Sequence, residues 1–195
     1  FKALYNEHGH TLAEYDEWMD WKEFICLMST ALYHINLDFP GNNIIMWRPT
    51  AEGGKWRWVM KDTDFGLGLY GRDVNYKVLD WLHNPNYDYN NNWGANSYDA
   101  TRLFRRLMED PDFNREFIDR TAIYMGDFLN ERGTRATWDD MYYLAKAELL
   151  KHKELNKPDW AWWGYNAESE YNNELTNARN WLARRTDIFY TQLAN

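Results

Sequence analysis

Residues 43–61 have the pattern of a β-hairpin in a chain whose other periodic segments are helical. In the second half of this stretch side chains alternate with the two-residue period of a strand. The connection between the two runs, Pro49–Gly54, contains the Pro and Gly residues that hairpin loops favour. We expect one face of the second strand to carry Trp56, Trp58 and Met60, and the other to carry Arg57, Val59 and Lys61.

The segments around the hairpin are predicted to be helices. An amphipathic helix follows a capping box at Asp20 and Glu23, and it must end by Phe39 because Pro40 disfavours the helical conformation before it. Further helices are expected from Ser97 or Asp99 to a point before Asp110, from Pro111 to Gly133, from Thr137 through Leu149, and from about Glu168 to Gln192. One hairpin among helices predicts an α+β fold that is mainly α.

Size and composition exclude several classes of protein. A chain of 195 residues is sufficient for one domain, and its 18% aromatic residues are untypical of a disordered chain. No stretch approaches the about 20 apolar residues of a membrane-spanning helix. The net charge of −8 argues against a protein that binds nucleic acid. The arginine clusters are interpreted as solvated helix faces; they are Arg102, Arg105 and Arg106, and Arg184 and Arg185.

Four side chains with oxygen ligands flank the hairpin. Asp38 ends the first amphipathic helix, Asn43 stands five residues later, and Asp62 and Asp64 follow the second strand. This order resembles the catalytic half of a protein kinase, in which one Asp orients the acceptor hydroxyl while an Asn and another Asp hold the metal. Asp and Asn oxygens suit Mg²⁺, whereas Cys and His favour softer metals. The alternative is that these residues only form turns and strand ends.

The stretches Ile35–Arg48 and Gly54–Gly68 resemble the core of the spore-coat protein H (CotH) kinase-like family. They are similar to its Asn-x-Asp-Trp-Pro-x-Asn-Asn stretch, its aromatic-Arg pair, its Gly-Lys-Trp and its Asp-Leu-Asp-aromatic-x-Phe-Gly turn. Leu103–Leu107 and Asp112–Phe117 resemble its C-terminal helices. The resemblance covers nearly the whole chain. It implies an atypical protein kinase that transfers phosphate from ATP to protein substrates with a divalent metal, Mg²⁺ or Mn²⁺.

The resemblance also implies a role for each matching residue. Asp38 would be the catalytic carboxylate, and Asn43 and Asp62 would be metal ligands. Asp64 spells Asp-Phe-Gly with the two residues after it and would be a second ligand or a support, so the principal ligand of this pair stays open. The supporting residues would be Arg48, Trp58, Phe65 and Gly66.

The chain departs from the family pattern in two respects. Phe39 replaces the usual Trp, which is a mild change. No Gly-rich phosphate loop and no nucleotide-anchoring Lys with a Glu partner precede residue 16. We therefore expect residues 1–195 to be a single domain, equivalent to the C-lobe of the kinase-like fold, that lacks the N-terminal lobe of the same protein and is inactive alone. The resemblance favours a spore-coat or exported cell-surface location.

Two other functions remain open from the sequence. A carbohydrate-binding or carbohydrate-active module would use the stacking residues Trp160, Trp162 and Trp163 and the loop Tyr87–Trp93. A pseudokinase-like structural protein of a spore coat or surface would keep the fold without catalysing phosphoryl transfer.

Overall fold

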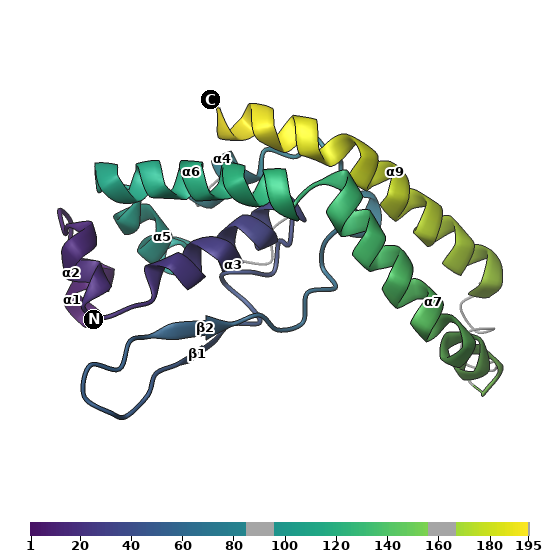
Figure 1. Cartoon of the computed structure of the whole chain (residues 1–195), viewed down its shortest axis with the longest axis horizontal. Coiled ribbons are helices and arrows are strands. Elements are labelled where there is room, and N and C mark those ends of the chain that lie inside the picture. Colours follow the sequence, from purple (N-terminus) through teal and green to yellow (C-terminus); the bar gives the residue numbers. More distant parts are fainter. Residues whose placement is uncertain (85–95, 156–166, 195) are drawn as a thin grey trace.

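The computed structural model describes residues 1–84, 96–155 and 167–194 (Figure 1). Its elements confirm a mainly helical α+β fold with one small antiparallel sheet. In chain order they are α1 (Lys2–Asn6), α2 (Leu12–Asp16), α3 (Trp21–Tyr33), β1 (Ile45–Trp47), β2 (Arg57–Val59), the 3₁₀ helix η1 (Leu69–Gly71), α4 (Val78–His83), α5 (Arg102–Leu107), α6 (Pro111–Asp127), α7 (Glu131–Leu155) and α9 (Ala167–Leu193).

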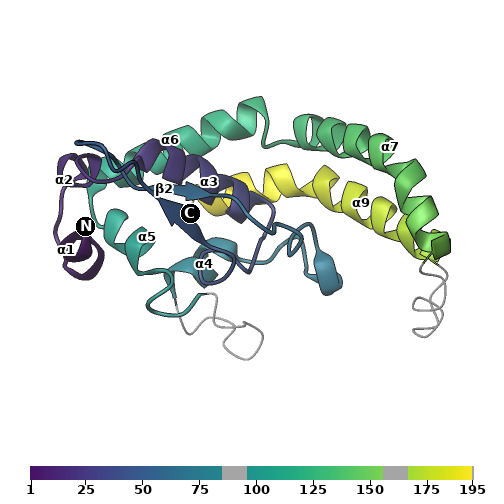
Figure 2. The ribbon, with the colours of Figure 1, turned by 90° about the horizontal axis from the view of Figure 1, so that it is seen from below.

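The helix α3 lies at the centre of the fold and contacts β2, α6 and α9. It begins where Asp20 accepts a hydrogen bond from the amide of Glu23 at 3.1 Å. The predicted capping box is only half formed, because the Asp20 amide instead donates to the carbonyl of Trp56 at 2.9 Å. The start of α3 is therefore fastened to the hairpin as well as capped. In Figure 2 the hairpin crosses α3, and α7 and α9 run side by side away from it.

The hairpin is confirmed, with strands of three residues each. Ile45 pairs with Val59, Met46 with Trp58 and Trp47 with Arg57. The ring centroid of Trp58 lies 4.7 Å from that of Phe24 in α3, and Trp58 is only 4% exposed. This contact holds one face of the sheet on α3. The opposite face carries Ile45, Trp47 and Val59, which are exposed.

The boundary between α6 and α7 differs from the prediction. The sequence places one helix from Pro111 to Gly133, but α6 ends at Asp127 and α7 begins at Glu131. Asn130 explains the break, because its side-chain oxygen accepts a hydrogen bond from the Gly133 amide at 2.9 Å, as an N-cap residue does. A Cβ on Gly133 would lie 2.7 Å from the carbonyl oxygen of Phe128, so this glycine allows the tight junction.

Two arginines that the sequence predicts to be solvated are buried. Arg106 is 5% exposed and donates to Glu109 at 2.7 Å. Arg185 is fully buried, whereas its neighbour Arg184 is exposed. The prediction is wrong here because charge clustering along a helix does not reveal which side chains a distant segment covers.

Arg185 of α9 caps the C-terminal end of α3. Its guanidinium donates to the carbonyls of Tyr33 at 2.7 Å, Leu32 at 2.9 Å and Val74 at 3.0 Å. The ring of Phe189 lies 4.8 Å from the guanidinium carbon. The last carbonyls of a helix lack hydrogen-bond donors within the helix and carry partial negative charge. The buried guanidinium supplies the donors and balances this charge. This contact joins α9 to the residues that lead into Asp38.

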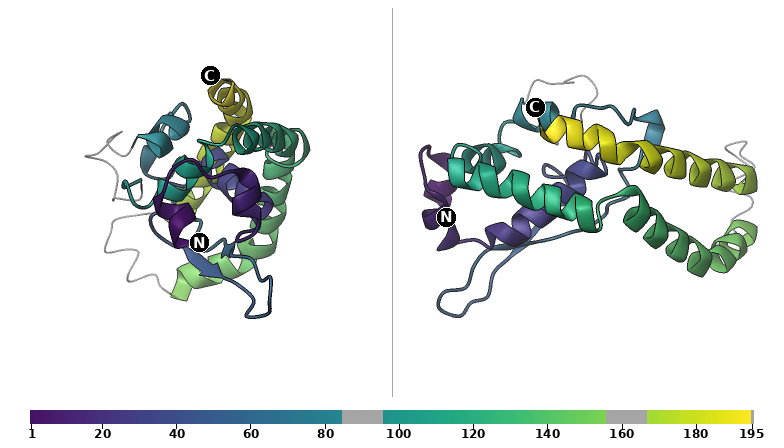
Figure 3. Two further views of the ribbon diagram at one scale, coloured as in Figure 1. Left: turned by 90° about the vertical axis from the view of Figure 1, so that its left-hand side faces the viewer. Right: turned by 45° about the horizontal axis from the view of Figure 1, so that its top comes forward.

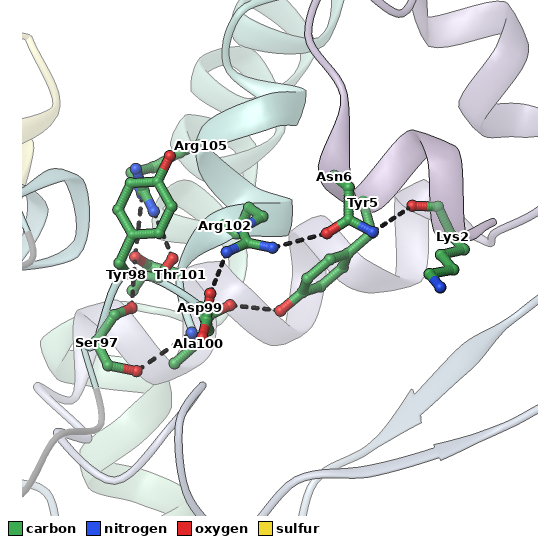
Figure 4. A network of polar contacts seen from close by, with 10 residues as sticks. All are labelled: Lys2, Tyr5, Asn6, Ser97, Tyr98, Asp99, Ala100, Thr101, Arg102 and Arg105. Carbon is green, nitrogen blue, oxygen red and sulfur yellow. Dashed lines mark hydrogen bonds and ion pairs between the residues drawn. The ribbon is translucent and has the colours of Figure 1, made fainter.

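Polar contacts fasten the first helix to the segment that leads into α5 (Figure 4). Arg102 donates to Asn6 at 2.7 Å and also pairs with Asp99. The hydroxyl of Tyr5 donates to the backbone carbonyl of Asp99. Cation–π contact adds to the cluster, since the guanidinium of Arg105 lies 4.2 Å from the ring centroid of Tyr98. These contacts stabilise the end of the molecule opposite to the far ends of α7 and α9 (Figure 3).

Replacing Gly68 with Ala is expected to lower the free energy of unfolding by about 2 kcal/mol, measured by urea denaturation. Gly68 has a φ of 85°, and a Cβ there would lie 2.9 Å from the indole Cδ1 of Trp181. Gly71→Ala is the matched control, because Gly71 has a φ of 73° but no atom within 4 Å of such a Cβ. Equal losses for the two variants would show that the contact with Trp181 has no role.

No helix among the described residues is long and apolar enough to cross a membrane.

Candidate active site

Asp38 lies just beyond α3, in a segment that leaves the helix through an unusual backbone conformation. Ile35 has a φ of 53°, which is rare for a β-branched residue and turns the chain away from the helix axis. The side-chain oxygen of Asn36 then accepts a hydrogen bond from the Asp38 amide at 3.1 Å. Asp38 is half-buried, and it lies in the short turn that this hydrogen bond from its amide to Asn36 closes.

Asn43 meets Asp38, as the sequence predicts. Its amide Nδ2 donates to Oδ2 of Asp38 at 2.9 Å. Asn43 has a φ of 54°, a left-handed conformation that Asn tolerates better than most residues. The five-residue spacing therefore closes into a side-chain contact, and Asn43 leads directly into the hairpin.

Asp62 and Asp64 also lie near Asp38, and both are exposed. Burial raises the pKa of Asp38 above its ordinary value, and the charges of Asp64 and Asp62 raise this pKa further. Hydrogen bonds from Asn42 and Asn43 act in the opposite direction, because they stabilise the ionised form. The charges of Asp62 and Asp64, just beyond the hairpin, therefore act on Asp38, just beyond α3.

Backbone hydrogen bonds hold the acidic turn against the end of α3. The amide of Leu37 donates to the carbonyl of Phe65 at 3.3 Å, and the amide of Leu67 donates to the carbonyl of His34 at 2.9 Å. Between them lies Gly66, where a Cβ would be 3.1 Å from the His34 carbonyl oxygen. Phe65 packs against the core. Phe65 and Gly66 therefore help to join the acidic turn to the end of α3, and their supporting roles remain predictions.

Arg48 and Trp58 lie elsewhere on the hairpin. Trp58 is part of the hydrophobic core beneath the sheet. The guanidinium carbon of Arg48 lies 5.6 Å from the ring centroid of Trp56, and Arg48 is exposed. Their supporting roles remain predictions, in which Trp58 would act by fixing the hairpin on α3.

A pocket of about 720 Å³ adjoins the acidic turn. Residues 60–64 form one side of it, and Ala31 of α3 and His34, the residue after α3, form another. Three residues from the distant helices also line it: Trp138 of α7, and Glu174 and Ala178 of α9. The indole nitrogen of Trp138 is buried without a hydrogen-bond partner among the described residues. Carboxylates at the mouth and a largely apolar wall suit a ligand with a charged and an apolar part.

His34 contributes a neutral imidazole to this pocket. Its Nδ1 donates to the carbonyl of Thr30 at 2.8 Å. Burial lowers the pKa of His34, which the hydrogen bond to Thr30 opposes and the charge of Arg185 reinforces. The sequence marks His34 only as a neighbour one turn before Asp38. No sequence pattern pointed to Trp138 or Glu174, because both come from helices about one hundred residues further along the chain.

Among the described residues, no group of three or more His, Cys, Asp or Glu side chains is placed to hold a metal ion. The oxygen donors of this region are the Asp38 carboxylate, which Asn43 contacts, and the Asp62 and Asp64 carboxylates, whose charges act on Asp38. Oxygen donors of this kind fit a hard cation such as Mg²⁺. The residues assigned to carbohydrate binding, Tyr87–Trp93 and Trp160–Trp163, lie outside the described residues.

Comparisons with known proteins agree with the family suggested by the motifs. A family model described as CotH kinase protein matches residues 2–189, nearly the whole chain. Searches of curated proteins and of solved structures found no match. The extent of the family match suggests an atypical kinase-like function, in which ATP, a divalent metal and a protein substrate are the general participants. The chain therefore belongs to the CotH kinase protein family.

Proposed function

We propose that this chain provides the catalytic residues for metal-dependent transfer of the γ-phosphoryl group of ATP to a hydroxyl group of a protein. The observation that carries the proposal is the meeting of Asp38 with Asn43 at 2.9 Å, next to the charges of Asp62 and Asp64. Phosphoryl transfer is catalysed mainly by positioning and by charge stabilisation, and it requires a carboxylate beside oxygen ligands for a metal.

Asp38 would orient the acceptor hydroxyl and accept its proton. A carboxylate whose pKa is raised accepts a proton more readily, and burial together with the neighbouring carboxylates raises the pKa of Asp38. The hydrogen bond from Asn43 fixes one carboxylate oxygen, Oδ2. The remaining oxygen, Oδ1, would receive the proton as the hydroxyl oxygen attacks the γ-phosphorus and the bond from that phosphorus to the β–γ bridging oxygen breaks, which releases ADP.

Asn43 and Asp62 would hold Mg²⁺ or Mn²⁺, with Asp64 as a second ligand or a support. Mg²⁺ in such sites is usually bound by one or two carboxylates together with substrate phosphates, and in this proposal Asp62 and Asp64 would supply the carboxylates. When bound, the metal neutralises the phosphate charge that develops during transfer. The left-handed conformations of Asn43 and Asp62, with φ of 54° and 51°, fix where their short side chains start.

We further propose that the chain corresponds to the C-lobe of the kinase-like domain and depends on an N-terminal lobe of the same protein for activity. In this proposal the part that covers the nucleotide lies outside residues 1–195. The family name supports an association with the spore coat, and an exported or surface location is the alternative to be tested.

Asp62→Asn in the full-length protein is expected to raise the Mg²⁺ concentration for half-maximal transfer about tenfold, because a neutral amide binds Mg²⁺ more weakly than a carboxylate does. The measurement is transfer of labelled phosphate from ATP to a protein acceptor across an Mg²⁺ titration. Asp80→Asn is the control, since Asp80 is an exposed residue of α4 outside the site. Unchanged Mg²⁺ dependence would exclude Asp62 as a ligand, and no transfer by the unaltered protein would exclude the proposed function.

A further inference from the structure

We propose that Lys61 is a phosphate-binding residue of this site and contacts the phosphate groups of the bound nucleotide. The inference rests on the proposed function, since it assigns the nucleotide phosphates to the same acidic turn. Lys61 differs from the oxygen ligands in charge and in chemistry. It lies within the stretch Gly54–Gly68 but immediately before the Asp-Leu-Asp-aromatic-x-Phe-Gly turn, so that motif does not include it.

Lys61 lies where a phosphate next to Asp62 would be found. It lies two residues after the end of β2 and directly precedes Asp62 in the chain. Both residues line the pocket of about 720 Å³, together with Asp64. Lys61 is exposed, so its four-carbon side chain can turn toward a ligand at the mouth of this pocket. Its position therefore allows contact with a ligand that also contacts the acidic turn.

The charges around this pocket require a cation. Its described lining includes the carboxylates of Asp62, Asp64 and Glu174, whereas Lys61 is its one Lys or Arg side chain. His34 does not add a positive charge at neutral pH, because its pKa is lowered by burial. A nucleotide triphosphate would be repelled by such a site unless positive charge accompanied it. A divalent metal would supply part of that positive charge, and the ammonium group of Lys61 would supply a part that belongs to the protein itself.

The other cations of the hairpin are engaged elsewhere. Lys55 pairs with Asp16 at 2.9 Å, and Arg57 pairs with Asp20 at 2.9 Å. Arg48 lies over the ring of Trp56. Lys61, in contrast, forms no ion pair with a carboxylate in the described part of the chain, although two aspartates are close in sequence. An ammonium group without a carboxylate partner remains available to bind a phosphate oxygen by a charge-assisted hydrogen bond.

The test is Lys61→Met in the full-length protein, with binding measured by calorimetry in Mg²⁺ for ATP, adenosine and inorganic tripolyphosphate. We expect the Kd for ATP and for tripolyphosphate to rise about tenfold and the Kd for adenosine to stay unchanged, since only the first two carry phosphate. Lys61→Arg should recover most of the affinity. Lys55→Met is the matched control on the same hairpin and should leave all three Kd values unchanged.

The outcomes separate this inference from the proposed function. Equal losses for ATP and adenosine, or no loss at all, would overturn the role of Lys61 even if the protein transfers phosphate. Lys61-dependent binding of tripolyphosphate without any transfer would support the phosphate site and contradict the kinase function. If the unaltered protein binds neither ATP nor tripolyphosphate, both proposals are wrong.

Discussion

Asp38→Asn is expected to reduce phosphoryl transfer by the full-length protein at least about 100-fold, because an amide cannot accept the proton of the acceptor hydroxyl. The substitution is nearly isosteric and keeps an oxygen that can accept the hydrogen bond from Asn43. A steady-state assay at saturating ATP and Mg²⁺ measures the effect, which should appear in kcat rather than in the KM for ATP. Full activity of this variant would exclude Asp38 as the catalytic carboxylate.

The same variant should be slightly more stable than the unaltered protein at neutral pH. Burial and the charges of Asp64 and Asp62 raise the pKa of Asp38 in the folded state. A raised carboxyl pKa contributes stability below the pKa of the unfolded state, and this contribution is lost as pH rises through the folded-state pKa. The uncharged amide of the variant has no such loss, so the Tm advantage of Asp38→Asn should be present at pH 7 and disappear near pH 3. A lower Tm at pH 7 would mean that the loss of activity reflects damage to the fold.

Arg185→Met is expected to lower the free energy of unfolding by about 3 kcal/mol, which corresponds to a decrease in Tm of about 6–12 °C for a chain of this size. Methionine fills much of the same volume but leaves the carbonyls of Leu32, Tyr33 and Val74 without their donor. Burial lowers the pKa of Arg185 to about 9, which is still above neutral, so the guanidinium is charged at pH 7. Thermal unfolding followed by circular dichroism measures the change.

Arg184→Met is the control for this substitution, because Arg184 is the preceding residue of the same helix and is exposed. We expect it to change stability by no more than about 0.5 kcal/mol. Similar losses for the two variants would show that the contacts of Arg185 with the end of α3 do not stabilise the fold.

Much of the site can be predicted from the sequence because its determinants are local. Pro40 requires the helix before Asp38 to end by Phe39, although α3 already ends at Tyr33, and the alternation in Lys55–Lys61 indicates the second strand. The spacing of Asp38 and Asn43 then closes a turn within six residues, and the structure brings the two side chains into contact. Short-range steric and hydrogen-bonding rules are sufficient for each of these steps.

The parts that the sequence could not predict depend on contacts between distant segments. The residues next to Arg185 in the sequence do not distinguish it from an arginine on a solvated helix face. Its burial follows only from the packing of α9 on α3. Trp138 and Glu174 reach the pocket for the same reason. The break between α6 and α7 was missed because Gly133 resembles the residue after a helix, whereas here it lies in the first turn of the next one, capped by Asn130.

The contact between Arg185 and the end of α3 has a consequence for the order of events during synthesis. A ribosome completes α3 and the segment containing Asp38 about 150 residues before Arg185 emerges. Until then the carbonyls of Leu32 and Tyr33 lack the donor that they have in the finished fold. The segment that contains Asp38 is therefore made before α9 but reaches its final structure only after α9 has emerged, so the candidate site forms late relative to its own synthesis.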